Sequence, residues 1–237
     1  KNKYYILKKN LQRKLGLLLT KDLNEIMNSK KDNFLLVQEY LPEVLTINKR
    51  KLNIRLYFVI ICHGDKYGCY LYNEGKCIYA NKDYDYESKD MESHVTSLDL
   101  DYDIYKNNPL TLNDLKKYMD NNSMNYETLW TNINTNLRHV SLSIKDHLCT
   151  NKNLKNNLSF QIFGPDILVD SKFKPFLLEI NKGPSMAANI DREILIKNNL
   201  FIDTIALVRF FCQKHNIKKT FNVKSGHANN FTIINEY

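Results

Sequence analysis

The sequence predicts an α+β fold. Apolar strands follow one another with short polar turns between them, most clearly in the pair 163–169 and 175–181. Helical periodicity is confined to separate stretches, chiefly 126–148, where apolar residues recur every three or four positions. Strands joined as hairpins, with helices in segments of their own, are typical of this fold class.

The strands are predicted from β-forming residues and from the turn residues that follow them. In chain order, we expect strands at 4–7, 34–41, 51–62, 69–72 and 76–79, ahead of the pair named above. The strand 34–41 should stop at Pro42. The last two strands flank Asn73-Glu74-Gly75, which predicts that they form a hairpin.

The helices are predicted from periodicity and from capping residues. A short helix is expected within 20–30, capped by Thr20 with Asp22 in its first turn. Longer helices are expected at 112–119, 126–148 and 191–212, the last partly interrupted at Asn198-Asn199. Residues 81–110 are polar and predict a loop, and residues 213–237 give little signal.

Composition limits the functional classes. The chain has 237 residues and a formal charge of +8, which suits an acidic partner such as nucleotide phosphates or an acidic protein tail. No nucleic-acid-binding motif is present, so a nucleic acid partner is not expected. No apolar run is long enough for a membrane span, so no membrane partner is expected either.

The five cysteines include no CxxC pair and are odd in number, which argues against a zinc site and a disulfide scaffold. A reducing, cytoplasmic compartment fits this usage best. The chain starts without Met and enters a strand almost at once, which favours a fragment or a processed product.

Three oxygen-bearing side chains occupy chosen points of the predicted hairpin. Asp166 is near the start of its first strand, and Glu179 and Asn181 are two apart near the end of the second. Asp and Asn at strand ends are often turn formers. However, Glu179 interrupts an apolar run, and a buried carboxylate is costly unless it is paired or binds a metal. We therefore predict that the three residues hold Mg²⁺.

Two basic segments are candidates for phosphate binding. The loop from Lys8 to Gly16 carries cationic side chains, among them Arg13, although a solvated basic loop would look the same. Lys51, Asn53 and Arg55 project from one face of their strand, although an ordinary half-exposed strand would also show this pattern.

Several motifs of the chain resemble the tubulin tyrosine ligase-like family, a branch of the ATP-grasp ligases. The string FGPDILVDSKFKPFLLEINKGPS is similar to the family pattern FGxDxxxDxxxKxWLLEVNxxPS. VQEYL (37–41) resembles the adenine-side hinge, RKLNIRLY (50–57) the RKFDIRxY motif, and HVTS (94–97) the HLTN motif. The motifs occur in family order over roughly residues 4–210.

The resemblance implies an ATP-grasp fold with two lobes and mainly antiparallel sheets that clasp ATP. It implies lobes at 1–50 and 51–237, and a further N-terminal subdomain to which nothing here corresponds. It implies ATP and Mg²⁺ as cofactors, with a metal site at Asp166, Glu179 and Asn181. The residues that it assigns to ATP are Lys8, Arg13, Gln38, Glu39, Tyr40, Leu41 and Lys51.

On the substrate side, the resemblance assigns Arg55, together with Lys51, to catalysis and Asn53, Lys76, His94 and Lys182 to substrate binding. Two positions depart from the family pattern. Asn53 replaces an Asp and so lacks the charge that can orient an incoming amine. Ile78 replaces an arginine that binds a substrate carboxylate, a role that Lys76 would fill only as a point charge.

The expected function is ATP-dependent ligation of a free amino acid to a protein carboxylate through an acyl phosphate, with an acidic tubulin tail as the acceptor that the family implies. The changes at Asn53 and Ile78 leave open a ligase with another protein or peptide acceptor. A non-catalytic pseudo-ligase that serves binding or assembly also stays open.

Overall fold

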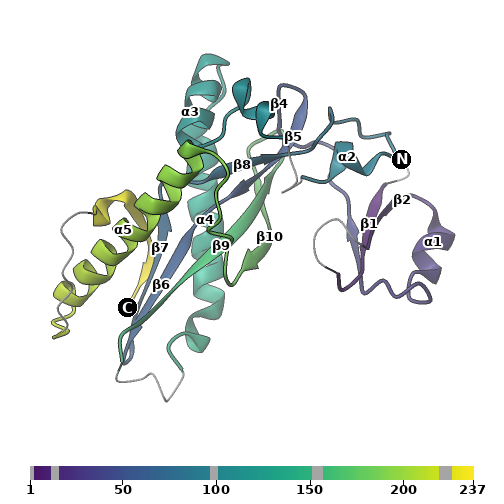
Figure 1. Ribbon diagram of the computed structural model, residues 1–237. Helices are drawn as coiled ribbons and strands as arrows, with labels where there is room; N and C mark the ends of the chain where they lie inside the picture. The colour runs from purple at the N-terminus through teal and green to yellow at the C-terminus, as the bar shows by residue number, and fades with distance from the viewer. Residues whose placement is uncertain (1–2, 12–15, 97–100, 151–156, 219–225) are drawn as a thin grey trace. The chain divides into compact units, whose positions relative to one another are not determined.

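The computed structural model describes residues 3–11, 16–96, 101–150, 157–218 and 226–237 (Figure 1). The chain forms two compact units, each built from segments that are distant in sequence. The first unit comprises Lys1–Asn53, Ile78–Asn108 and Val169–Phe173, and the second comprises Ile54–Cys77, Pro109–Leu168 and Lys174–Tyr237. The predicted lobe boundary at residue 50 stays a prediction.

A three-stranded antiparallel sheet lies in the first unit. Its strands are β1 (Tyr5–Lys8), β2 (Leu17–Thr20) and β3 (Leu36–Glu39), in the order β2-β1-β3. In this register Ile6 pairs with Leu19 on one side and with Gln38 on the other. The strands predicted at 4–7 and 34–41 are therefore confirmed, and β3 is left at the edge of the sheet.

The short helix predicted within 20–30 is α1 (Leu23–Asn28), but its cap is Asp22 rather than Thr20. The Asp22 side chain accepts a hydrogen bond of 2.7 Å from the Asn24 amide. Thr20 acts one step earlier, because its hydroxyl accepts from the Asp22 amide at 2.9 Å. The carboxylate takes the cap because it reaches an amide of the first turn and also favours the positive helix end.

The predicted loop at 81–110 contains two short helices, α2 (Met91–His94) and the 3₁₀ helix η1 (Tyr102–Lys106). Asp90 and Asp101 cap them, each accepting from the amide two residues on. These helices have too few turns to show an apolar period, so the sequence pattern alone does not reveal them.

A second, eight-stranded sheet has the order β11-β7-β6-β9-β5-β4, with β10 paired to β9 and β8 paired to β5. The register pairs recorded between its strands are antiparallel. Its strands are β4 (Thr46–Ile47), β5 (Arg50–Arg55), β6 (Phe58–His63), β7 (Lys66–Tyr72), β8 (Lys76–Tyr79), β9 (Ser159–Val169), β10 (Pro175–Asn181) and β11 (Phe231–Glu236).

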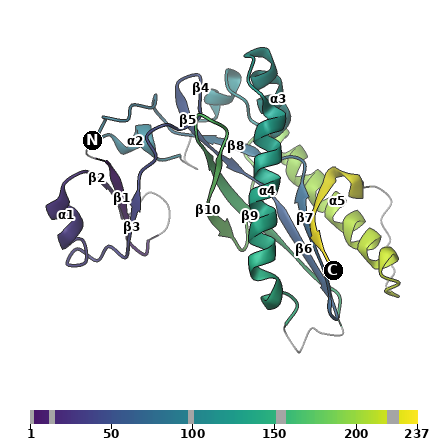
Figure 2. The same cartoon turned by 180° about the vertical axis from the view of Figure 1, so that it is seen from behind.

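Two long helices of the second unit lie on opposite faces of its sheet (Figures 1 and 2). They are α4 (Tyr126–Ile144), followed by the 3₁₀ helix η2 (Lys145–His147), and α5 (Asp191–Lys214). The predicted helix 126–148 is confirmed, with Leu129, Ile133 and Leu137 buried.

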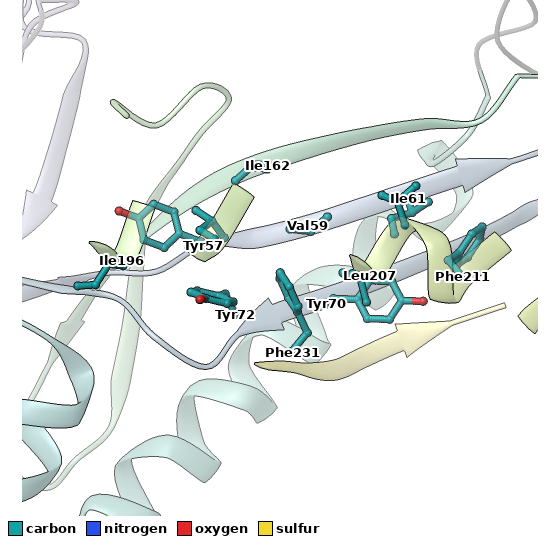
Figure 3. Close-up of a cluster of buried hydrophobic side chains, with 12 residues drawn as sticks. Tyr57, Val59, Ile61, Tyr70, Tyr72, Ile162, Ile196, Leu207, Phe211 and Phe231 are labelled. Atoms are coloured by element: carbon teal, nitrogen blue, oxygen red, sulfur yellow. The ribbon is translucent and has the colours of Figure 1, made fainter. Parts of the chain in front are cut away.

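The core between the sheet and α5 is built from alternate strand residues (Figure 3). Val59 and Ile61 of β6 lie in one cluster with Leu207 and Phe211 of the helix, and Tyr57, just before β6, belongs to the same cluster beside Ile196. Phe58 and Ile60, which alternate with them, are also buried, so β6 is covered on both faces. This explains why the segment is a nearly continuous apolar run.

The single strand predicted at 51–62 is wrong, because the segment forms β5 and β6 with a break at Leu56-Tyr57. At the break the backbone hydrogen bonds change partner. The Leu56 amide donates to Pro165 O, whereas Tyr57 O accepts from Tyr72 N, both at 2.9 Å. Local alternation does not reveal such an exchange, because both halves keep strand-forming residues.

The hairpin predicted at Asn73-Glu74-Gly75 is also wrong. β7 pairs with β6 and β11, and β8 pairs with β5. Gly75 lies so close to the backbone of β5 that an added Cβ would be 2.6 Å from Arg55 O. The true hairpin joins β6 to β7, with His63 opposite Lys66.

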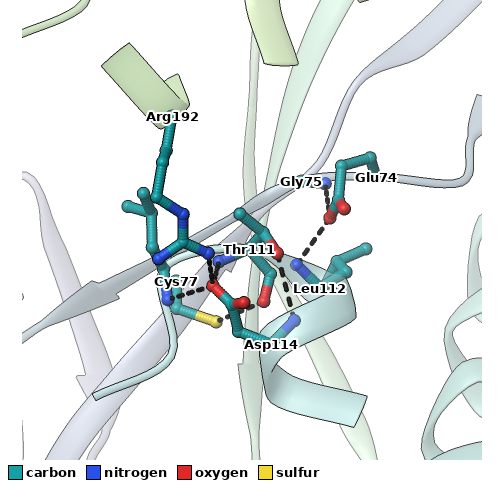
Figure 4. Close-up of polar contacts among 8 residues, drawn as sticks. Glu74, Gly75, Cys77, Thr111, Leu112, Asp114 and Arg192 are labelled. Atoms are coloured by element: carbon teal, nitrogen blue, oxygen red, sulfur yellow. Dashed lines mark hydrogen bonds and ion pairs between the residues drawn. The ribbon is translucent and has the colours of Figure 1, made fainter. Parts of the chain in front are cut away.

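The helix α3 (Leu112–Asn121) confirms the helix predicted at 112–119. The Glu74 side chain, rather than forming a hairpin turn, caps the start of this helix (Figure 4). Its carboxylate accepts from the Leu112 amide at 2.6 Å and from the Gly75 amide at 2.9 Å. Asp114 completes a capping box with Thr111 and pairs with Arg192 of α5.

The last third of the chain departs from expectation twice. Helix α5 runs through Asn198-Asn199 without the predicted interruption, since buried Lys197 and Leu200 anchor it on either side. The weakly predicted end of the chain forms the 3₁₀ helix η3 (Ala228–Asn230) and the strand β11, which pairs with β7. Phe231 of β11 belongs to the core.

One disulfide joins Cys62 of β6 to Cys149, which corrects the expectation drawn from the odd cysteine number. The two cysteines are 87 positions apart in sequence, and their Cα atoms are 5.5 Å apart. The fold brings them together, because Cys149 follows the helix that covers the sheet. Cys69, Cys77 and Cys212 are buried thiols. Among the described residues, no helix is both long and apolar enough to cross a lipid bilayer.

We predict that Asp203→Ala will lower the free energy of unfolding of the second unit by about 2–4 kcal/mol. Asp203 is buried and accepts from Tyr72 Oη at 3.0 Å, His227 N at 2.7 Å and Asn230 Nδ2 at 2.8 Å. Its loss leaves these donors without their acceptor. Urea unfolding followed by the fluorescence of Trp130, the single tryptophan, measures the change.

Asn198→Ala is the matched control, because Asn198 is exposed on the same helix. This substitution should change stability by less than about 0.5 kcal/mol. An equal loss in the two variants would contradict the role given to Asp203.

Candidate functional site

The β9–β10 hairpin brings the three predicted metal ligands together. They lie where Asp166 of β9 is next to the C-terminal end of β10. Asn181 Nδ2 lies 3.4 Å from Asp166 Oδ2 and 3.2 Å from Glu179 Oε1. The same amide group donates to Gly164 O at 3.2 Å, which fixes it over the neighbouring strand. The convergence inferred from strand spacing is therefore present in the fold.

Arg55 joins this cluster by pairing with Asp166. Its Nε lies 2.5 Å from Asp166 Oδ1, and its Nη2 lies 2.8 Å from Oδ2. Both side chains are only 13% exposed, so little solvent screens the pair. The sequence assigned Arg55 to catalysis and Asp166 to the metal, but it gave no sign that the two are in contact.

A glycine is required beside this pair. A Cβ on Gly164 would lie 2.7 Å from Pro184 Cβ and 3.2 Å from Arg55 Cδ. Any larger residue would push the arginine or the proline away. The FGPD and KGPS strings of the sequence thus meet at one packed point.

The donor set of the hairpin fits a hard cation by its chemistry, since two carboxylates and one amide are oxygen ligands of the kind that Mg²⁺ prefers. Asn181 here turns its Nδ2 to the carboxylates, so it would present Oδ1 to a metal after a half-turn of the amide. Among the described residues, no group of three or more His, Cys, Asp or Glu side chains forms a further candidate.

One premise of the metal prediction is wrong. Glu179 is exposed rather than buried, because among the described strands β10 pairs only with β9. Pro175 is the only fully buried residue of β10. The apolar letters around Glu179 therefore do not imply a buried carboxylate. Its accessibility is compatible with a ligand that meets a metal and solvent together.

A second polar cluster lies in the first unit, around the buried side chain of Lys51. Lys51 Nζ donates to Tyr40 Oη at 3.1 Å and stands 4.6 Å from the centre of the Tyr40 ring. Tyr40 Oη lies 2.9 Å from His94 Nδ1. His94, which the resemblance assigned to the substrate, is 2% exposed and uses both ring nitrogens in hydrogen bonds.

Burial, and to a smaller extent the positive charge of Lys8, lowers the pKa of Lys51 to about 7. An ammonium group without a carboxylate partner is costly in such a place. An anion bound beside Lys51 and Lys8 would remove that cost. The two lysines assigned to phosphate are therefore close enough to influence each other.

Asn53, two residues after Lys51 on β5, donates from Nδ2 to Thr96 Oγ1 at 2.9 Å. Its Oδ1 is buried and, within the described residues, has no hydrogen-bond partner. A buried carbonyl oxygen in this state is a good acceptor for an incoming N–H group. Thr96 of the HVTS motif is thus in contact with the strand-face residue, whereas Ser97 lies outside the described residues.

The adenine-side hinge 38–41 forms the end of the edge strand β3. The Tyr40 amide already donates to Tyr4 O at 2.9 Å, and Gln38 pairs with Ile6. Because backbone groups alternate along an antiparallel edge, those of Glu39 face outward. Leu41 follows the strand, and its carbonyl accepts from Tyr84 Oη at 3.3 Å. The Glu39 side chain pairs with Lys3 at 2.7 Å, so the backbone is what this segment offers to a base.

Lys76, assigned to a substrate carboxylate, pairs with Glu193 of α5 at 2.9 Å. Glu193 also accepts from Lys197 at 2.6 Å, and Lys197 donates to Ala187 O. Burial alone would raise the pKa of the Glu193 carboxyl, but the two lysines hold it below its ordinary value. Glu193 and Lys197 were not predicted from the sequence, although their i, i+4 spacing on a helix is a signal for such a pair.

The remaining predicted residues are placed as follows. Lys182 is exposed, and its carbonyl accepts from Gln161 Nε2 at 2.8 Å. Lys8 is half-buried at the end of β1. Arg13 lies outside the described residues.

Comparison with known proteins agrees with the motifs. A sequence model described as the tubulin-tyrosine ligase family matches residues 1–218. Human tubulin polyglutamylase TTLL6 is 27% identical over 237 residues, covering 92% of this chain and 26% of the relative. A probable beta-tubulin polyglutamylase of Tetrahymena thermophila is 29% identical over 227 residues, covering 85% and 18%. Tubulin polyglutamylase ttll-5 of Caenorhabditis elegans is 29% identical over 194 residues, covering 73% and 26%.

The chain thus spans about a quarter or less of the length of these curated relatives. The family match covers all the motifs around the two polar clusters, from Lys8 to Asn181. The mixed helices and mainly antiparallel sheets also agree with the α+β, ATP-grasp-like fold expected of these ligases. The chain belongs to the tubulin-tyrosine ligase family.

Proposed function

We propose that this chain is an ATP-dependent carboxylate–amine ligase that joins a free amino acid to a carboxylate of an acidic protein tail, with tubulin as the acceptor. The observation that carries the proposal is the convergence of Asp166, Glu179 and Asn181, with Arg55, on the β9–β10 hairpin. The names of the relatives support glutamate addition to tubulin. The formal charge of +8 suits an acidic tail.

In the proposed reaction the acceptor carboxylate takes the γ-phosphoryl group of ATP, which releases ADP and forms an acyl phosphate. Lys8 and Lys51 neutralise the negative charge of the phosphates, and the backbone of the hinge 38–41, with the outward groups of Glu39, holds the base. Asp166, Glu179 and Asn181 would hold Mg²⁺, whose chemistry is to neutralise charge on the phosphates and orient them.

The amine of the incoming amino acid then attacks the acyl carbon, and inorganic phosphate leaves. Asn53 accepts an N–H hydrogen bond from this amine, a role that its buried Oδ1, without a partner among the described residues, supports. Arg55 stabilises negative charge that develops at the acyl group, and its pairing with Asp166 fixes the guanidinium plane. A tubulin-tail acceptor would place this reaction in the cytoplasm.

A specific observation also favours a second candidate, a ligase of the same chemistry with a different acceptor or donor. Ile78 fills the position of the family arginine, and it is buried at 7% exposure. Lys76, the possible substitute, is itself paired with Glu193. The carboxylate-binding part of the substrate side therefore differs from the family pattern, whereas the metal residues are retained. Incubation with ATP, labelled amino acids and either tubulin or other proteins separates the two candidates.

We predict that Glu179→Gln will weaken the binding of Mg·ATP about tenfold or more, because it removes one charged oxygen ligand. Calorimetry with the wild type and the variant at fixed free Mg²⁺ measures the change. Without Mg²⁺ the two proteins should bind ATP with similar, low affinity. Glu25→Gln, at an exposed site on α1, is the matched control and should behave like the wild type.

Binding that is equally strong in wild type and Glu179→Gln would contradict the metal assignment. If the folded wild type binds no Mg·ATP at all, the chain does not act as a ligase, and a non-catalytic binding or assembly module becomes the better account.

We predict that ATP binding takes up a proton at pH 8 and weakens up to tenfold per pH unit between about pH 7.5 and 9. The free protein has a Lys51 pKa of about 7, and a phosphate beside the amine raises it. Below pH 7 Lys51 is charged in both states, so its contribution to affinity is complete. As the pH rises above 7 the free amine is neutral, and binding must protonate it.

Calorimetry in buffers of different ionisation enthalpy counts the protons taken up. Lys51→Arg should bind ATP with no such uptake, because arginine stays charged in this range. Proton uptake that persists unchanged in Lys51→Arg would assign the effect to another group.

A further inference from the structure

A chain of hydrogen bonds runs through the interior of the first unit from Lys51 to a backbone carbonyl. Lys51 Nζ is 3.1 Å from Tyr40 Oη, which is 2.9 Å from His94 Nδ1. His94 Nε2 is in turn 2.8 Å from Ser88 O. Lys51, Tyr40 and His94 are 6%, 5% and 2% exposed, so water does not compete for these bonds.

The direction of every bond follows from its last member. Ser88 O is a carbonyl oxygen and can only accept, so His94 carries a proton on Nε2. In the neutral ring Nδ1 is then an acceptor, and Tyr40 must donate its hydroxyl hydrogen to it. The lone pairs of Tyr40 Oη are left facing Lys51, whose ammonium group donates to them.

The surroundings keep the chain in this state. Burial lowers the pKa of His94, and the charge of Lys51 lowers it further, although Asp85 and Asp90 act in the opposite direction. Burial also raises the pKa of the Tyr40 phenol, and the neighbouring phenols of Tyr84 and Tyr86 act in the same direction, so Tyr40 keeps its hydrogen. A proton added to His94 Nδ1 would point at the hydroxyl hydrogen of Tyr40 and break the chain.

Aromatic rings enclose the three side chains and limit their movement. The Tyr86 ring stacks on Tyr40 at 6.1 Å between centroids, and the Tyr84 ring meets His94 edge-on at 5.9 Å. Lys8 is the cation that acts on Lys51 from β1. Within the described residues, the only hydrogen-bond acceptor recorded for Lys51 Nζ is the Tyr40 phenol.

We propose that Tyr40 and His94 are positioning residues that favour the charged form of Lys51 and fix the direction of its ammonium group, and that His94 acts through Tyr40 rather than by touching the substrate. The proposal rests on the function proposed above, in which Lys51 meets a nucleotide phosphate. The physical cause is that the imidazole polarises the phenol, and a polarised phenol oxygen is a stronger acceptor for an ammonium hydrogen. Loss of either member therefore favours the neutral amine.

The test is the titration of Lys51 itself, followed by NMR on protein labelled with ¹³C and ¹⁵N at lysine and measured without nucleotide. Lys51→Arg identifies the resonance. Tyr40→Phe keeps the ring beside Lys51 and Tyr86 but removes the hydroxyl, and it should lower the midpoint of the Lys51 titration by about one pH unit. His94→Phe, which keeps a buried ring, should lower it in the same direction.

Tyr86→Phe is the matched control. Tyr86 belongs to the same aromatic cluster, but among the described residues its hydroxyl accepts from the Tyr4 amide at 3.3 Å and makes no hydrogen bond to Lys51, so the midpoint should not move. No shift in Tyr40→Phe, or an equal shift in Tyr86→Phe, would overturn the proposal. A shift in Tyr40→Phe without one in His94→Phe would overturn the part given to His94.

The Tyr40→Phe variant is the decisive one if His94→Phe does not fold, as judged by circular dichroism. A separate titration with ATP tests the function on which the proposal rests. The Lys51 resonance should move on addition of ATP in the wild type. A midpoint that depends on Tyr40, with no response to ATP, would support the hydrogen-bond chain and reject the nucleotide role of Lys51.

Discussion

The ion pair between Arg55 and Asp166 is the interaction on which the candidate metal site depends. It joins β5 to β9, two neighbouring strands of the sheet, and it fixes the carboxylate against which Asn181 and Glu179 are arranged. Breaking such a pair leaves an uncompensated charge, which is more costly than the pair itself is favourable. The close packing of Gly164 against Pro184 and Arg55 holds this geometry from the other side.

The same interaction limits what the site can do. Asp166 offers two oxygens, and both already accept hydrogen bonds from one guanidinium. A carboxylate has about four lone-pair directions, so a metal and Arg55 can share Asp166 without exchanging places. If Asp166 held Mg²⁺, Arg55 would stay paired with the same carboxylate, and its guanidinium could meet a developing negative charge with little loss of side-chain freedom.

The two polar clusters solve the problem of buried charge differently. Near Asp166 each cation has an anionic partner within hydrogen-bond reach. Lys51 donates to a neutral phenol, which is itself bonded to an imidazole. Burial and the charge of Lys8 therefore give the amine a pKa near 7, and it responds to an approaching anion. Burial disfavours the charge of both Arg55 and Lys51, and among the described residues only Arg55 has a neighbouring carboxylate that offsets it.

The sequence by itself determined the family, the hairpin with its three oxygen-bearing residues, and the helices with a clear apolar period, because these depend on local spacing. Only the tertiary structure decided the Arg55–Asp166 pair, the Lys51–Tyr40–His94 chain, the disulfide and the partners of β7 and β8. It also placed Glu179 at the surface, although the residues around it in the sequence are apolar. Each of these features joins residues far apart in the chain or depends on which face of a strand is covered by its neighbours. Strand propensity is a local property and predicts neither the distant partner nor the covered face.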